Sequence, residues 1–161
     1  MFTQPVALLL AAAVLLVFLR VKYKVDDVMI EIQHAAGVLD DFALHHPGKY
    51  AMGDRAGMFA ITTASPVLQT EGLMSDRGYL EHIRAQDDLR SVLAGYGVNY
   101  YVAFIQKKNK IWQHDHACFH AMEPSIAGPD ALRMRSDFCE APVFQFPGDD
   151  GDYLIYRIHP A

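Results

Sequence analysis

The sequence has few charged residues and no surplus of positive charge. Only 20% of its 161 residues are Asp, Glu, Lys or Arg, and its formal net charge is −5. A nucleic-acid-binding surface needs clustered Lys and Arg. Basic residues cluster only at 20–24 and 107–110. We therefore exclude nucleic acid as a partner.

Several motifs of catalysis and cofactor binding are also missing. Neither G-x-G-x-x-G nor G-x-x-x-x-G-K-[ST] occurs, and no Ser-His-Asp order or Cys-His pair indicates a nucleophile. The chain contains no internal repeat, and its length suits one domain plus a terminal element. The sequence predicts a single domain without a complete catalytic apparatus and without a bound cofactor.

Apolar residues are concentrated at the N-terminus. Every residue from Val6 to Leu19 is apolar, and the run approaches the roughly 20 residues that span a bilayer. A secretory signal peptide is the alternative, but no basic residue precedes the run and no A-x-A site follows it. We therefore expect residues 1–24 to form a transmembrane anchor with a basic flank at Arg20, Lys22 and Lys24. By the positive-inside rule, that flank would hold the domain in the cytoplasm.

The rest of the chain alternates helix and strand patterns. Residues 25–48 are expected to form a connecting helix, and 49–161 an α/β domain. Alternation of this kind predicts a parallel β-α-β-α-β core in a three-layer-like arrangement. The turn Pro147–Asp152 predicts a C-terminal β-hairpin. The expected strands are 49–52, 66–70, 99–105, 142–146 and 153–158. The expected domain helices are a short one that follows the turn 53–57 and ends at about residue 63, and a long one at 76–94.

Candidate ligand-binding residues follow the first two expected strands. Gly53, Asp54, Arg55 and Gly57 form a turn before a helix, where backbone N–H groups can hold an anion. Glu71 follows the second strand and should lie at the same sheet edge as Asp54, where open α/β folds bind ligands. A small nucleotide- or nucleotide-sugar-binding enzyme is therefore one alternative. In the other interpretation, Asp54 caps the helix and the glycines only form the turn.

A histidine-rich run could bind a metal ion. His114, His116 and His120, together with Asp115 and Cys118, are donors for zinc or copper at close spacing. The run lacks the separated pairs of ligands typical of a structural zinc site. A membrane-anchored metal-binding protein is thus an alternative, and a solvated loop or edge strand is the other interpretation.

The stretch YAMGDRAG…SPVLQTEGL resembles the C-terminal extracytoplasmic region of bacterial multi-pass GT-C glycosyltransferases, which use polyprenyl-phosphate sugars. Their G-D-x-x-G turn, P-V strand and acidic-Gly-Leu step match positions here. Similar matches occur at Gly97–Val102, at Glu123 with Pro124, and at Ile155–Ile158. The matched positions in the first stretch are Gly53, Asp54, Gly57, Pro66, Val67, Glu71, Gly72 and Leu73.

The resemblance implies a non-catalytic terminal domain of a membrane glycosyltransferase, accessory to lipid-linked sugar transfer. Its expected partners are the lipid bilayer, the membrane-embedded part of the enzyme, and a lipid-linked sugar or acceptor. The domain would then lie in the periplasm, because earlier helices of such an enzyme, rather than the basic flank, would fix the direction of this helix. The early extracytoplasmic loop that carries the catalytic carboxylate in such enzymes has no counterpart here, so the chain would correspond to the final helix and the terminal domain.

The only two cysteines are Cys118 and Cys139. If the domain faces outward, as the resemblance implies, oxidation favours a disulfide between them. Two buried thiols in a cytoplasmic domain are the alternative.

Overall fold

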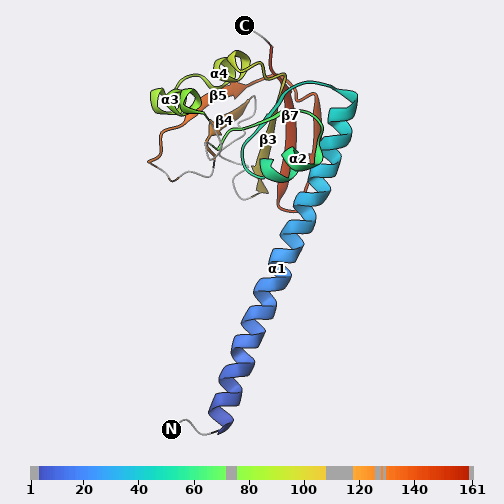
Figure 1. The fold of residues 1–161 in the computed structure, drawn as a ribbon, viewed down its shortest axis with the longest axis vertical. Coiled ribbons are helices and arrows are strands. Elements are labelled where there is room, and N and C mark those ends of the chain that lie inside the picture. Colours follow the sequence, from blue (N-terminus) through green and yellow to red (C-terminus); the bar gives the residue numbers. More distant parts are fainter. Residues whose placement is uncertain (1–3, 72–75, 108–117, 126–127, 129, 160–161) are drawn as a thin grey trace.

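The computed structural model describes residues 4–71, 76–107, 118–125, 128 and 130–159, with side chains from residue 8 on. Its longest element is α1 (Gln4–His45), one continuous helix. The C-terminal part of α1 packs on the domain, and the N-terminal part projects beyond it (Figure 1). Pro47 follows the helix and cannot continue it.

The predicted transmembrane anchor is wrong. Among the described residues, no helix combines the length and the apolar character needed to cross a membrane. The apolar run Val6–Leu19 would be only about 21 Å long at 1.5 Å per residue, whereas a bilayer core is about 30 Å thick. The same helix continues directly into Arg20, Lys22 and Lys24.

A five-stranded mixed sheet forms the centre of the domain, in the order β2-β1-β3-β7-β6. β1 pairs in parallel with β2 and with β3, whereas β7 is antiparallel to both β3 and β6. The C-terminal hairpin is therefore part of the main sheet. The strands are β1 (Tyr50–Met52), β2 (Val67–Gln69), β3 (Tyr100–Gln106), β6 (Phe144–Pro147) and β7 (Gly151–Arg157).

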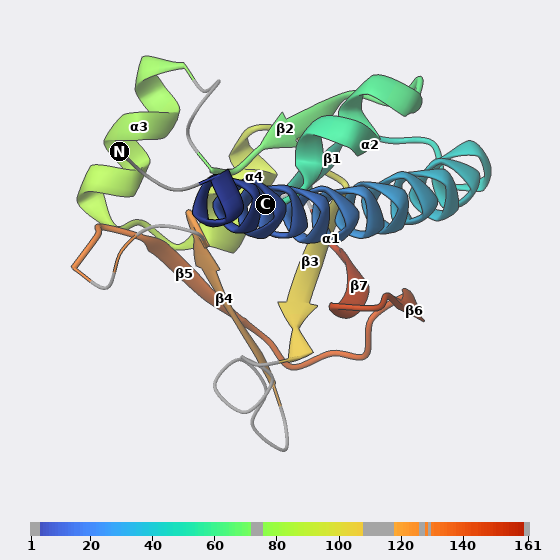
Figure 2. The ribbon, with the colours of Figure 1, turned by 90° about the horizontal axis from the view of Figure 1, so that it is seen from below.

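Both faces of the sheet are covered. Side chains alternate along β3: Tyr100 and Val102 pack with α1 and α2 (Ala56–Thr62), and Tyr101 and Ala103 pack on the other side. That other face carries α3 (Arg77–Ala85), α4 (Leu89–Gly95) and a second hairpin of β4 (Phe119–Glu123) and β5 (Met134–Phe138). Figure 2 shows α3 and this hairpin on one side of the sheet and α2 on the other.

Two further expectations differ from the structure. The helix expected at 76–94 is divided into α3 and α4, because Gln86 adopts a left-handed conformation and Asp88 caps a new helix. The β4–β5 hairpin lies in a stretch interpreted as mostly loop. Buried residues alternate with half-buried ones along β4 and with exposed ones along β5, and the buried apolar side chains complete the core against Tyr101 and Tyr156.

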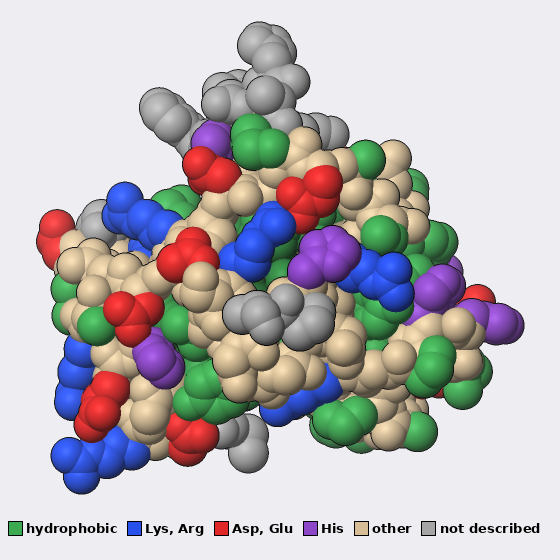
Figure 3. Space-filling view, turned by 90° about the horizontal axis from the view of Figure 1, so that it is seen from above, with side chains coloured by type: hydrophobic (Ala, Val, Ile, Leu, Met, Phe, Trp, Pro, Cys, Tyr) green, Lys and Arg blue, Asp and Glu red, His purple; other side chains and the backbone are tan. Residues whose placement is uncertain are grey.

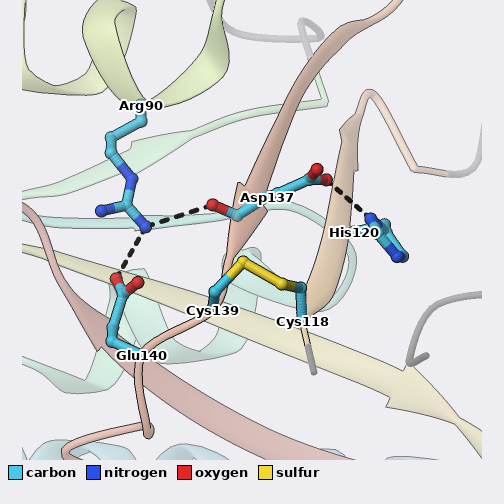
Figure 4. Close-up of a disulfide and its surroundings, with 6 residues drawn as sticks. All are labelled: Arg90, Cys118, His120, Asp137, Cys139 and Glu140. Atoms are coloured by element: carbon cyan, nitrogen blue, oxygen red, sulfur yellow. Dashed lines mark hydrogen bonds and ion pairs between the residues drawn. A yellow bond between two sulfur atoms is a disulfide. The ribbon is translucent and has the colours of Figure 1, made fainter. Parts of the chain in front are cut away.

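A disulfide joins the ends of this second hairpin. Cys118 precedes β4 and Cys139 follows β5, and their Cα atoms lie 4.0 Å apart (Figure 4). The predicted pairing is present, and it closes the end of the hairpin where its two strands would otherwise separate.

Candidate functional site

The parallel strands β1 and β2 end at the same edge of the sheet, and a pair of carboxyl groups lies there. Glu71 follows β2, and the structure adds Glu123, the last residue of β4. Both residues are buried, with exposed fractions of 8% and 3%. Buried acidic residues are rare unless they are hydrogen-bonded or neutral.

Ser125 connects the two carboxyl groups. Its backbone N–H donates to Glu123 Oε2 (3.1 Å) and to Glu71 Oε1 (3.2 Å), and its hydroxyl donates to Glu71 Oε1 (2.6 Å). From β3, the Tyr101 hydroxyl donates to Glu123 Oε1 (2.8 Å). These hydrogen bonds join the main sheet to the segment that follows β4.

Gly53 leaves room for this network. A Cβ atom on Gly53 would lie 2.6 Å from both carboxyl oxygens of Glu123, so any side chain there would displace a buried and hydrogen-bonded carboxyl group. The matched glycine of the G-D-x-x-G turn is therefore required here by close packing against Glu123.

The surroundings of Glu123 favour the protonated form of its carboxyl group. Burial raises its pKa from 4.5 to about 8; the hydrogen bond from Tyr101 opposes this rise, and the charge of Glu71 adds to it. Burial also raises the pKa of Tyr101 well above 10, with the Glu123 carboxyl as a second cause. The site is thus a neutral acid and a neutral phenol beside a second carboxyl group.

The space at this site is very small. A cavity of about 20 Å³ is lined by Gly53, Asp54, Tyr101, Glu123 and neighbouring side chains. A single water molecule needs about 10–15 Å³ by this measure, so the cavity has room for about one. Among the described residues, the cavity beside Glu123 has room for about one water molecule and none for a sugar or a nucleotide.

Arg55 does not point into the carboxyl site. Its guanidinium donates to Glu31 Oε1 of α1 (3.1 Å) and to the Tyr153 hydroxyl (3.2 Å), and it lies 3.5 Å from Asp150. It also packs over the ring of Phe104, 4.0 Å from the ring centroid. The side chains of Arg55 and Glu31 are only 10% and 6% exposed, so this buried pair fixes α1 to the domain.

The remaining turn residues have other roles. Arg55, in a left-handed conformation, is the N-cap position of α2, rather than Asp54. Asp54 lines the carboxyl cavity and approaches Arg55 at 4.0 Å. Gly57 lies inside α2, and a Cβ there would meet open space. Of the predicted ligand set, the structure thus groups Gly53, Asp54 and Glu71 around Glu123, and it directs Arg55 toward α1.

The histidine run is only partly described. His114 and His116 lie outside the described residues. His120 Nδ1 lies 2.6 Å from Asp137 Oδ1, its cross-strand partner (Figure 4). Cys118 is in the disulfide. Within the described part of the chain, no group of three or more His, Cys, Asp or Glu residues is arranged to hold a metal ion.

Comparison with known proteins adds no relatives. No family model matches the chain, and no curated protein or solved structure is significantly similar to it. The resemblance to glycosyltransferases therefore stays a prediction.

Sequence reasoning missed Glu123, Tyr101 and Ser125 as members of the site. Glu123 appeared only in the Glu-Pro step of the resemblance, and Tyr101 only within an expected strand and the matched stretch Gly97–Val102. A buried tyrosine needs a hydrogen-bond partner for its hydroxyl, and this was the one signal available. It indicates that an acceptor exists without identifying it.

Proposed function

We propose that this chain is a non-catalytic accessory domain of a glycosyltransferase that uses lipid-linked sugars. It is attached to the helices of that enzyme by the projecting part of α1. The resemblance supplies the class of enzyme. The observation that carries the attachment is the exposed apolar surface of α1.

The projecting part of α1 is apolar on every side. From Leu8 to Leu19 each residue is Leu, Ala, Val or Phe, and each is exposed. Leu9 is 71% exposed, Leu16 68% and Phe18 64%. A helix that is hydrophobic all round is normally buried, because large apolar patches are unfavourable in water.

This pattern favours a multi-helix partner. One partner helix would cover a single stripe of α1, and the opposite side would stay exposed. Complete burial of a helix that is apolar all round needs several surrounding helices. The attachment is by helix packing and does not require α1 to cross a bilayer by itself.

Two features of the domain agree with an accessory role. The cavity that the described residues form beside Glu123 measures about 20 Å³, which leaves no room for a sugar substrate. The Cys118–Cys139 disulfide is typical of an oxidising compartment, which supports a periplasmic domain beside the enzyme. The end of the molecule opposite the projecting helix mixes acidic, basic and histidine side chains without a field of one sign (Figure 3).

Site-specific cross-linking in the native cell tests the attachment. A photo-reactive amino acid is placed at Leu9, Leu15 or Val17, which lie on different sides of α1, and at Ile61 as an exposed control on α2. We expect all three α1 positions to cross-link to helices of one multi-pass glycosyltransferase, identified by mass spectrometry, and Ile61 to give none. Cross-links to a second copy, to lipid alone or to unrelated proteins would refute the attachment.

A transfer assay tests the non-catalytic role. The chain alone should give no transfer of sugar from a polyprenyl-phosphate sugar, because the cavity beside Glu123 is too small for a sugar. Robust turnover by the purified chain would contradict this role.

A further inference from the structure

A second, open cavity lies on the opposite end of the domain from the projecting part of α1. It is a groove between α3 and α4, with a volume of about 480 Å³. Small-molecule sites typically measure about 300–1,000 Å³, so this groove is large enough for a sugar ring. Its lining residues are His82, Asp87, Ser91, Val92, Gly95 and Tyr96.

The aromatic side of the groove is held in place. The Tyr96 hydroxyl donates to Asp76 Oδ1 (2.9 Å), and the backbone carbonyl of Tyr96 accepts from Lys49 Nζ (2.9 Å). The ring also makes edge contacts with Tyr79 and His82. Because these contacts order Tyr96 in the free protein, a ligand would bind without the entropic cost of fixing it.

The polar side is an imidazole–carboxylate pair. His82 Nδ1 lies 2.7 Å from Asp87 Oδ2, and the two side chains are 41% and 46% exposed. Within the described part of the chain, His82 Nε2 and Asp87 Oδ1 have no hydrogen-bond partner. They are therefore available to a ligand as one imidazole nitrogen and one strong acceptor.

The chemistry of this lining selects against anionic ligands. The Asp87 carboxylate repels phosphates, and the buried Val92 and the Tyr96 ring offer a small apolar surface. A ligand that fits both sides has hydroxyl groups toward Asp87 and His82, and C–H groups toward Tyr96. We propose that the groove binds a pyranose ring of a glycan, and this assignment of a sugar rests on the proposed function.

A substitution at Gly95 can fill the groove without disturbing the fold. A Cβ on Gly95 would meet open space, and its φ lies outside the positive range that disfavours side chains. Gly95→Phe should therefore fold normally and place an aromatic ring in the cavity. Gly95→Ala adds one methyl group and leaves most of the cavity open, so it is the matched control.

Saturation-transfer NMR on the full chain tests the proposal. The protein is kept in a zwitterionic detergent without a sugar headgroup, because a maltoside would itself compete. The probes are the methyl glycosides of glucose, galactose, mannose and N-acetylglucosamine, each at about 10 mM, enough to occupy a site of millimolar affinity. We expect a saturation-transfer signal for at least one of these glycosides. The signal should be at least about fivefold weaker in Gly95→Phe and in Asp87→Asn, and it should be retained in Gly95→Ala.

The results separate this proposal from the attachment through α1. No transfer to any glycoside, or equal transfer in Gly95→Phe and the wild type, overturns the sugar groove while the α1 cross-links still form. Glycoside binding without those cross-links refutes the attachment alone.

Discussion

Replacing Glu123 by glutamine should remove most of the pH dependence of folding that the carboxyl site creates. The amide has nearly the size of the carboxyl group, and its oxygen can still accept from the Tyr101 hydroxyl. Because the amide cannot ionise, Glu123→Gln does not titrate at any pH; the Ser125 N–H loses its acceptor at Oε2, and this cost does not vary with pH.

The expected effect follows from the pKa of Glu123. Its folded-state pKa of about 8 lies above the ordinary 4.5, so the folded chain keeps a proton that the unfolded chain releases between these values. The stability that this proton contributes is fully present below pH 4.5 and is lost as the pH rises through 8. One proton changes the free energy of unfolding by about 1.4 kcal/mol per pH unit.

Urea denaturation of the full chain at several pH values between 5.5 and 8.5 measures the effect. Near-UV circular dichroism reports the buried tyrosines, and the detergent and salt are held constant. The quantity compared is the difference in free energy of unfolding between Glu123→Gln and the wild type, because other titrating groups cancel in it. This difference should rise in favour of the variant by about 1 kcal/mol per pH unit up to pH 8.

The control is Glu81→Gln, an exposed carboxyl on α3 that pairs with Arg77. Its difference from the wild type should stay within about 0.5 kcal/mol at every pH. Parallel pH profiles for Glu123→Gln and the wild type would show that Glu123 is ionised in the folded protein, and the reasoning about the buried pair would fail.

Three other changes test separate parts of the structure. Gly53→Ala should destabilise the fold by about 1–3 kcal/mol, because the added methyl group clashes with the Glu123 carboxyl. Gly57→Ala places a methyl group in open space inside a helix and should be neutral or slightly stabilising in the same urea assay. Equal effects of the two substitutions would contradict the close packing at Gly53. Arg55→Ala leaves the Glu31 carboxylate buried without its cation and should lower the free energy of unfolding by about 3–5 kcal/mol. Hydrogen exchange should also become faster in the part of α1 that packs on the domain. The control Arg77→Ala, at an exposed pair, should lower the free energy of unfolding by less than about 0.5 kcal/mol. Replacing Cys118 and Cys139 by serine should cost about 3 kcal/mol, and an unchanged urea midpoint would mean that the bridge does not form.

Some local elements could be predicted because their signals lie in neighbouring residues. The β-prone run at Tyr100–Gln106 and the turn before β7 mark strands directly. The positions of Asp54 and Glu71 after two parallel strands place them at one edge of the sheet. The break between α3 and α4 could not be predicted from local signals. It depends on the left-handed conformation of Gln86, and neither glycine nor proline stands there to indicate a helix end.

The sequence by itself determined which segments are apolar and at which charged residues they end. It also determined that two acidic residues follow strands expected to be parallel. Only the tertiary structure decided that Glu123 joins Glu71 and that Arg55 turns to Glu31. In each case the partners lie more than 20 residues apart in the chain. The reason is physical: a buried charge or hydroxyl requires a partner, but the partner is chosen by how helices and strands pack, and that choice leaves no local pattern in the sequence.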